Sequence, residues 1–234
     1  MELPYVPCLG GDINQDIKVS IIISEWLGYF LLYESMLKTV VFARDKWLEP
    51  GGIMLPDKAT MYVCAAEDLK MKNERIDFWN NVYGFDMSVI RDVAQREAIV
   101  DVIDAEAICT NAVPIHKIDI LKCTQEAMSF DSSFILHATR NDYIHAFVVF
   151  FECAFTQIHK PLVISTSPFA PYTHWKQTIF YLEDTLKICK GEKIDASLKC
   201  RPNTKNARDL DIDITLKIQG KFCTMEWGSS YRLR

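Results

Sequence analysis

Hydrophobic and polar residues alternate along the second half of this 234-residue chain with the period of a β-strand. The clearest run sets five apolar residues against four polar ones, namely Leu210, Ile212, Ile214, Leu216 and Ile218 against Asp211, Asp213, Thr215 and Lys217. Because successive side chains of a strand point to opposite faces, one face of this strand is expected to be buried. Similar runs predict strands at residues 118–122, 133–139, 143–155, 178–186 and 193–199. The last half should therefore form a mostly antiparallel sheet or barrel.

The first half follows a different pattern, which predicts a strand, a loop and a helix. The β-branched run from Lys18 to Ile23 is typical of a buried strand. After a loop, apolar residues recur at helical spacing from Glu34 to a helix-stop signal at residues 49–52; they are Met36, Leu37, Val40, Val41, Trp47 and Leu48. Another strand is expected at residues 59–66. Taken with the second half, the chain is expected to be α+β.

Residues 67–92 differ from both halves, because mixed charges accompany aromatic residues that are expected to be exposed: Phe78, Trp79, Tyr83 and Phe85. This segment is expected to leave the core. A satellite core under a loop is the alternative interpretation.

Composition narrows the class of protein. Hydrophobic residues make up 49% of the chain and charged residues 24%, as in ordinary globular proteins. The net charge of −5 argues against direct nucleic-acid binding, which relies on basic residues, and favours basic partners. No apolar run reaches the roughly 20 residues that cross a bilayer, and no signal peptide is visible, so we expect no membrane association and a cytoplasmic and nuclear location.

Cysteine and histidine patterns give no support for a metal site. The eight cysteines are scattered without a C-x-x-C pair and are expected to be free and mostly buried. The histidines at 116, 137, 145 and 159 are dispersed and read as structural residues. Several acidic residues could form a surface that attracts basic tails, although a solvated strand face is the simpler interpretation: Asp209, Asp211, Asp213, Glu67-Asp68 and Glu183-Asp184.

The predicted loop holds two glutamates, Glu25 and Glu34, nine residues apart in an aromatic setting. A guanidinium offers five donors in a rigid fork, and two converging carboxylates can satisfy most of them while fixing its orientation. Spacing alone favours a simpler interpretation, in which Glu34 is an acidic first-turn residue of the helix and Glu25 is solvated. The Gly10-Gly11 pair reads as a surface turn, since no helix is predicted directly after it.

Several motifs together resemble the protein arginine methyltransferase family. The string Ser24–Met36 resembles its double-glutamate loop, and Tyr172-Thr173-His174-Trp175-Lys176-Gln177 resembles its threonine-histidine-tryptophan loop. The similarity continues through residues 82–88, 140–143, 201–203 and 231–232. The resemblance implies a remnant of a Rossmann-like methyltransferase domain at residues 1–56. It further implies a β-barrel domain at residues 57–234, with a helical dimerisation arm at about 67–92.

The resemblance also implies roles for individual residues. Glu25 and Glu34 match the glutamates that grip the substrate guanidinium, and His174 matches the loop histidine of the catalytic centre. The implied substrate contacts are Tyr29, Tyr33, Met36 and Trp175, and the implied contacts to the cofactor S-adenosylmethionine are Met36 and Thr39. Taken alone, His174 beside a tryptophan reads as a structural loop residue.

The implied partners are basic proteins and other methyltransferase subunits. Substrates of the type I enzymes that the chain resembles are Arg/Gly-rich proteins, histone tails and RNA-binding proteins. The arm would dimerise through four aromatic residues and one methionine: Phe78, Trp79, Tyr83, Phe85 and Met87. In the family, the arm fills a pocket on the cofactor-binding half of the partner subunit. A symmetric homodimer of this chain is therefore expected to be compromised.

Two functions of different classes remain open. The family's glycine-rich cofactor turn has no counterpart in the sequence, so the isolated chain is expected to be inactive. The first function is a type I arginine methyltransferase that uses S-adenosylmethionine. The second is a catalytically dead truncated isoform or paralogue that acts as a regulatory or dimerisation partner of a full-length enzyme. An uncovered apolar strand at residues 20–23 would favour aggregation.

Overall fold

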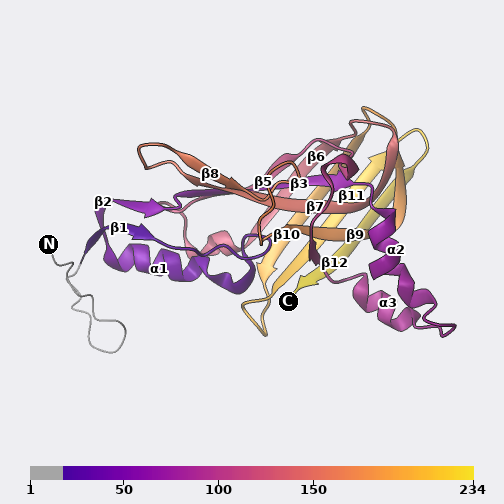
Figure 1. The fold of residues 1–234 in the computed structure, drawn as a ribbon, viewed down its shortest axis with the longest axis horizontal. Coiled ribbons are helices and arrows are strands. Elements are labelled where there is room, and N and C mark those ends of the chain that lie inside the picture. Colours follow the sequence, from indigo (N-terminus) through magenta and orange to yellow (C-terminus); the bar gives the residue numbers. More distant parts are fainter. Residues whose placement is uncertain (1–17) are drawn as a thin grey trace.

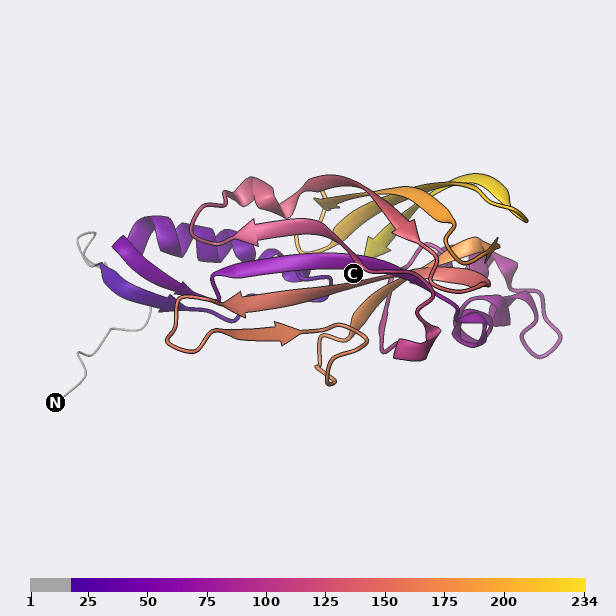
Figure 2. The ribbon, with the colours of Figure 1, turned by 90° about the horizontal axis from the view of Figure 1, so that it is seen from above.

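The computed structural model describes residues 18–234, so the Gly10-Gly11 turn and Cys8 lie outside the described residues. Figure 1 shows an elongated molecule with three parts. A small α/β unit lies at one end, two β-sheets form the middle, and a helical arm projects at the other end. Seen from above in Figure 2, β3 (Lys58–Ala66) and β7 (Asp142–Phe155) run along much of the sheet region.

The α/β unit contains the strand, loop and helix that the hydrophobic pattern predicted. Strand β1 (Val19–Ile23) pairs in parallel with β2 (Leu48–Leu55), and α1 (Leu37–Trp47) connects them. Helix α1 buries three apolar residues at helical spacing, Leu37, Val40 and Val41. The helix begins three residues later than expected, because Tyr33–Ser35 form a separate 3₁₀ turn, η1. The helix ends at Trp47, directly before the helix-stop signal at residues 49–52, which form part of β2.

Strand β1 is exposed, so the prediction of a buried strand was wrong. Ile21 and Ile23 are 50% and 75% exposed. The reason is that β1 has one strand neighbour, β2, within the described residues. The expectation of an uncovered apolar strand at residues 20–23 agrees with these exposures.

The middle of the molecule consists of two open antiparallel sheets, which within residues 18–234 do not close into a barrel. One sheet has the order β4-β9-β7-β3-β5 with β8 paired to β7, and the other has the order β12-β11-β10-β6. The remaining strands are β4 (Ile99–Asp101), β5 (Val113–Asp119), β6 (Phe130–His137), β8 (Leu162–Ser165), β9 (Gln177–Ile188), β10 (Lys193–Pro202), β11 (Leu210–Gln219) and β12 (Thr224–Leu233). The predicted strand at 118–122 was misplaced, since β5 ends at Asp119 and a turn follows.

One hydrophobic core lies between the facing surfaces of the two sheets. The alternation predicted for β11 is present: Leu210, Ile212, Ile214, Leu216 and Ile218 are all at most 2% exposed. From the six-stranded sheet, Met61, Val63, Phe147 and Phe180 contribute to the same cluster. The opposite face of that sheet has a smaller cluster that includes Ile76 from the base of the arm.

The arm consists of α2 (Leu69–Arg75), a 3₁₀ turn η2 (Asp77–Asn80) and α3 (Ser88–Ala94). Its base is anchored on β9, because Lys72 Nζ donates to the Glu183 carbonyl at 2.7 Å and Tyr181 donates to Asp68 at 2.6 Å. Burial lowers the pKa of Lys72. The arm thus leaves the core as expected, while its base is fixed to the sheet.

The described cysteines are free, as expected, and four of the seven are buried: Cys64, Cys109, Cys153 and Cys200. Burial raises the pKa of Cys64, Cys109 and Cys153 to about 12. Such thiols are poor nucleophiles at neutral pH. Among residues 18–234, no helix has the length and apolarity needed to cross a bilayer.

Candidate functional site

The loop between β1 and α1 folds back on itself. The Gly28 amide donates to the Leu31 carbonyl at 3.0 Å, and the Tyr33 amide donates to the Tyr29 carbonyl at 3.1 Å. A Cβ atom on Gly28 would lie 2.1 Å from the Tyr33 carbonyl oxygen, so no side chain fits there. This close approach joins the backbone shortly after Glu25 to the backbone directly before Glu34.

Four residues of this loop other than glycine adopt left-handed backbone conformations: Phe30, Leu31, Glu34 and Ser35, with φ between 52° and 74°. Such conformations cost about 1–2 kcal/mol each for L-residues. Strain of this kind often clusters at functional sites. Glu34 has φ 74° and lies in the first turn of η1, so it precedes α1 and is not part of its first turn, while Glu25 is exposed.

Both glutamates are held through one oxygen atom. Glu25 Oε1 accepts a hydrogen bond from the Leu27 amide at 3.0 Å. Glu34 Oε1 lies 3.1 Å from Nη2 of Arg208, in an ion pair that remains about half exposed on both sides. Neither Oε2 atom has a hydrogen-bond partner among residues 18–234. Each carboxylate can therefore accept a further donor.

The predicted substrate contacts differ in their surroundings. Tyr29 and Tyr33 stack with ring centroids 6.2 Å apart and an interplanar angle of 17°. Tyr29 is 38% exposed, whereas Tyr33 packs against the core. The two tyrosines thus form an aromatic surface on the double-glutamate loop.

The residues predicted to contact the cofactor do not form an enclosed site. Met36 is 39% exposed, and Thr39 is exposed on α1. A nucleoside cofactor needs a cleft that covers most of its surface. By themselves, Met36 and Thr39 provide at most one wall of such a cleft, so the described residues do not fit S-adenosylmethionine alone.

The second predicted motif lies directly against the loop. Trp175, from the segment before β9, donates from Nε1 to the Leu27 carbonyl at 2.8 Å. Its ring also meets Phe151 of β7 edge-on, with centroids 6.1 Å apart. The structure therefore brings together two motifs that are 148 residues apart in the chain.

His174 is exposed and contacts the Trp175 ring, with centroids 4.0 Å apart. It has no ion pair with any carboxylate of residues 18–234. The described residues thus leave its predicted catalytic role untested and also accommodate the structural interpretation.

The turn between β10 and β11 contacts the double-glutamate loop, which the sequence analysis did not predict. Besides the Arg208 ion pair, the Glu34 amide donates to the Arg208 carbonyl at 2.9 Å. The Ser35 hydroxyl donates to the Ala207 carbonyl. The asparagines at 203 and 206 indicate a turn, but their spacing carries no information about a contact with a loop that is 172 residues away.

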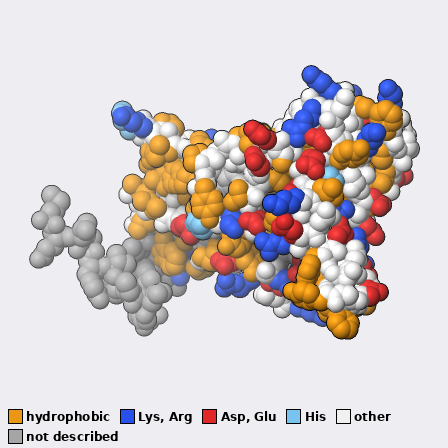
Figure 3. Space-filling model, turned by 45° about the vertical axis from the view of Figure 1, so that its right-hand side comes forward, with side chains coloured by type: hydrophobic (Ala, Val, Ile, Leu, Met, Phe, Trp, Pro, Cys, Tyr) orange, Lys and Arg blue, Asp and Glu red, His pale blue; other side chains and the backbone are white. Residues whose placement is uncertain are grey.

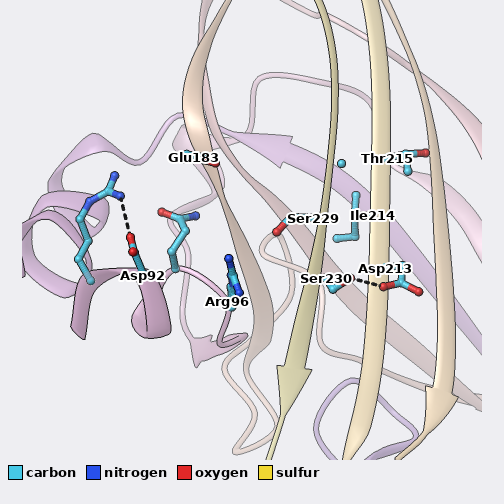
Figure 4. Close-up of a pocket in the computed structure, with 11 residues that line it drawn as sticks. Asp92, Arg96, Glu183, Asp213, Ile214, Thr215, Ser229 and Ser230 are labelled. Carbon is cyan, nitrogen blue, oxygen red and sulfur yellow. Dashed lines mark hydrogen bonds and ion pairs between the residues drawn. The ribbon is translucent and has the colours of Figure 1, made fainter. Parts of the chain in front are cut away.

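The predicted acidic surface is divided. In Figure 4, Glu183 of β9 and Asp213 of β11 line one cleft together with Asp92 and Arg96 from the arm side. Ser230 donates to Asp213 there at 2.5 Å. Elsewhere the acidic residues have partners of their own, since Asp211 pairs with Arg232 and Asp68 accepts from Tyr181. The predicted residues therefore do not form one continuous acidic patch.

The tip of the arm is apolar and open to solvent. Tyr83 and Phe85 are 94% and 73% exposed, while Trp79 and Met87 are partly buried. Figure 3 shows hydrophobic side chains at the lower right, where the arm projects. Exposed aromatic residues on a projecting element are typical of a protein interface.

Two of the four histidines predicted to be structural, His116 and His145, are packed into the fold. His116 stacks on Phe130 with centroids 4.3 Å apart, and burial lowers its pKa. His145 Nδ1 accepts from the Asp68 amide at 3.1 Å, and burial lowers its pKa as well. Within residues 18–234, no group of three or more His, Cys, Asp or Glu residues is placed to hold a metal ion.

Comparison with known proteins finds a matching protein-family model and similar relatives. Residues 57–221 match the family model described as the arginine methyltransferase oligomerization subdomain. The chain is 52% identical over 217 residues to protein arginine N-methyltransferase 1 of Chlamydomonas reinhardtii, covering 93% of this chain and 63% of that protein. It is 51% identical to protein arginine N-methyltransferase 8-B of Danio rerio, covering 93% of this chain and 52% of that protein. The chain thus spans between half and two thirds of the length of these relatives.

A solved structure is similar over nearly the whole chain. It is described as a Trypanosoma brucei PRMT1 enzyme-prozyme heterotetrameric complex with AdoHcy. The match has a TM-score of 0.91 and 42% sequence identity, and it covers 95% of this chain and 71% of that one. The open sheets, the arm and the α/β unit described above therefore follow an architecture that is already known.

Proposed function

The chain belongs to the protein arginine methyltransferase family, and on that premise we propose that it carries the arginine-recognising part of a type I-like methyltransferase. Glu25 and Glu34 would bind the guanidinium of a protein arginine, with Tyr29 and Tyr33 beside it. Arg/Gly-rich proteins, RNA-binding proteins and histone tails are the proposed substrates, because the chain's net charge of −5 favours basic partners.

The observation that carries this proposal is the ion pair between Glu34 and Arg208. It places a guanidinium 3.1 Å from the carboxylate that the resemblance assigns to substrate arginine. Each glutamate has a contact at Oε1, and the proposal is that both carboxylates share the donors of one guanidinium and orient it. Fixed orientation is the main contribution that these residues would make to catalysis.

Methyl transfer needs a donor, which in this family is S-adenosylmethionine. Met36 and Thr39 do not enclose a site for it, so we propose that these 234 residues alone recognise arginine without transferring a methyl group. The prediction has two parts, arginine binding and methyl transfer, and each has its own assay.

Arginine binding is tested by calorimetric titration of an Arg/Gly-rich peptide and of the same peptide with lysine at every arginine. Preference for arginine is expected, because a lysine ammonium cannot match two carboxylates with a planar fork of donors. Glu25→Gln and Glu34→Gln should each abolish the preference. Glu49→Gln, which removes the same charge from an exposed residue outside the loop, should retain it. Equal binding of the two peptides by the wild-type chain would refute the proposal.

Methyl transfer is tested with labelled S-adenosylmethionine and the Arg/Gly-rich peptide. The chain alone is expected to transfer no label. Transfer by the chain alone that Glu34→Gln abolishes would show that residues outside our assignment complete a cofactor site.

A second candidate function is regulation of a full-length family member, and the arm tip favours it. Tyr83 and Phe85 are largely exposed, and the similar solved structure is described as an enzyme-prozyme heterotetramer. We propose that the arm docks on a methyltransferase subunit. Mixing the chain with a full-length relative should change the transfer rate of that enzyme. Phe85→Ser should remove the effect without changing the thermal midpoint of the chain.

A further inference from the structure

The turn between β10 and β11 clamps the double-glutamate loop at two consecutive residues. The Glu34 amide donates to the Arg208 carbonyl at 2.9 Å, and the Ser35 hydroxyl donates to the Ala207 carbonyl. The Arg208 guanidinium then reaches the Glu34 carboxylate. Backbone and side chain of the same glutamate are thus held by one turn of the four-stranded sheet.

The turn itself is fixed to the sheet. Asn203, which is 8% exposed, accepts hydrogen bonds from the amides of Lys205 and Asn206 at 2.9 and 3.1 Å. Its Nδ2 atom donates to both carboxylate oxygens of Asp211 on β11, at 3.0 and 2.9 Å. An amide side chain with this many partners has little freedom, so the turn is a rigid base for the contacts it makes.

The clamp acts on a strained part of the loop. Glu34 and Ser35 have φ of 74° and 58°, in the left-handed region that residues other than glycine rarely adopt. Without outside contacts, these two residues would relax toward ordinary backbone angles and would turn the Glu34 side chain away. The contacts to Ala207 and Arg208 offset this tendency.

Arg208 can orient the Glu34 carboxylate without occupying all of its hydrogen-bond acceptor positions. A carboxylate has two oxygens and about four acceptor positions, and Arg208 Nη2 lies 3.1 Å from Oε1. Oε2 remains for a second guanidinium. We propose that Arg208, together with Asn203 and the Ala207 carbonyl, positions Glu34 for substrate arginine, an inference that rests on the proposed function.

Four variants and one control test the proposal. Ser35→Ala removes the hydroxyl contact, Asn203→Ala loosens the turn, and Arg208→Gln removes the ion pair while Arg208→Lys keeps the cation. Lys205→Gln, on the same turn but exposed, is the control. Two quantities are measured: the hydrogen exchange rate of the Glu34 amide, and the preference for an Arg/Gly-rich peptide over its lysine counterpart.

In the wild type, the Glu34 amide is expected to be protected from exchange. Ser35→Ala and Asn203→Ala should speed its exchange and lower the arginine preference by roughly 2- to 10-fold each, as expected for a lost hydrogen bond. Arg208→Gln should lower the preference with little change in exchange, and Arg208→Lys should restore part of it. Lys205→Gln should match the wild type in both measurements.

The outcomes separate this inference from the proposed function. Unchanged arginine preference in Ser35→Ala, Asn203→Ala and Arg208→Gln, despite preference in the wild type, would overturn the positioning role and leave the proposed function standing. An unprotected Glu34 amide in the wild type would overturn it as well. Absence of arginine preference in the wild type would refute the proposed function and, with it, this inference.

Discussion

Replacing Gly28 by alanine should disable the double-glutamate loop while leaving the sheets folded. The new Cβ atom would lie 2.1 Å from the Tyr33 carbonyl oxygen and 2.8 Å from its carbonyl carbon. Real Cβ atoms essentially never come closer than 3.0 Å to another heavy atom, so the backbones at Gly28 and Tyr33 must separate by at least about 0.9 Å. We expect this separation to displace Glu34, which directly follows Tyr33.

The size of this displacement sets the expected effects. A misplacement of about 1 Å at a site that depends on orientation can reduce its efficiency about 100-fold. We therefore expect Gly28→Ala to lose the preference for an arginine peptide over a lysine peptide. Overpacking of a buried position costs about 1–3 kcal/mol, so the free energy of unfolding should fall by that amount.

Calorimetric titration with the two peptides measures the preference, and urea unfolding followed by circular dichroism measures the stability. Gly228→Ala in β12 is the matched control, because the nearest atom to its new Cβ is a Thr215 methyl carbon at 3.3 Å. That variant should keep both the fold and the arginine preference. Full arginine preference in Gly28→Ala would refute the reasoning, since it would mean that the position of Glu34 is not important for guanidinium binding.

Three further predictions concern stability and solubility. Trp175→Phe leaves the Leu27 carbonyl without its donor and should destabilise the chain by about 1–3 kcal/mol in urea unfolding. Burial raises the pKa of Cys64, Cys109 and Cys153 from 9.0 to about 12, so the folded chain holds these protons more tightly. Stability should therefore be intact below pH 9 and fall between pH 9 and 12, and Cys64→Ala should reduce the fall measured by urea midpoints. Ile23→Lys should lower light scattering from aggregates, because it places a charge on the exposed β1 strand.

Periodicity predicted the strands well where one face is buried. The alternation from Leu210 to Ile218 coincides with β11, and the apolar run of residues 143–155 coincides with β7 to within one residue. Periodicity failed where particular backbone hydrogen bonds determine the conformation of the chain. Ile120 is apolar and fully buried, yet it lies in a turn because its amide donates to the Asp57 carbonyl and the amides after it return to Asp119. Strand β12 was missed because small polar residues weaken its alternation.

Sheet closure depends on pairing between distant strands, which periodicity does not report. The same alternating pattern suits a closed barrel and two open sheets, because each has one apolar face. Burial of β1 was likewise not predictable, since Val19, Ile21 and Ile23 form an apolar strand whatever lies next to them. Their exposure depends on which segments pack there.

The candidate site was predictable in its glutamates but not in its supports. Glu25 and Glu34 lie in one recognisable motif and Trp175 lies in a second one. Neither motif indicates that the two are in contact in the folded chain. That contact runs from an indole nitrogen to a backbone carbonyl, so any residue at position 27 could supply the acceptor. Arg208 was missed for a similar reason. One of its two contacts with Glu34 is made by the Arg208 backbone carbonyl, which any residue could supply.

These contacts change the meaning of the predicted domain boundary at residue 56. The double-glutamate loop lies before that boundary in sequence, yet it is held by Trp175 ahead of β9 and by Ala207 and Arg208 ahead of β11. The loop is therefore fixed from the sheet domain at both of its ends, near Leu27 and at Glu34 and Ser35. A movement of the α/β unit relative to the sheets would leave the carboxylates with the sheets. Arginine recognition should accordingly be a property of the sheet domain and its clamps, even though the glutamates themselves precede it in the chain.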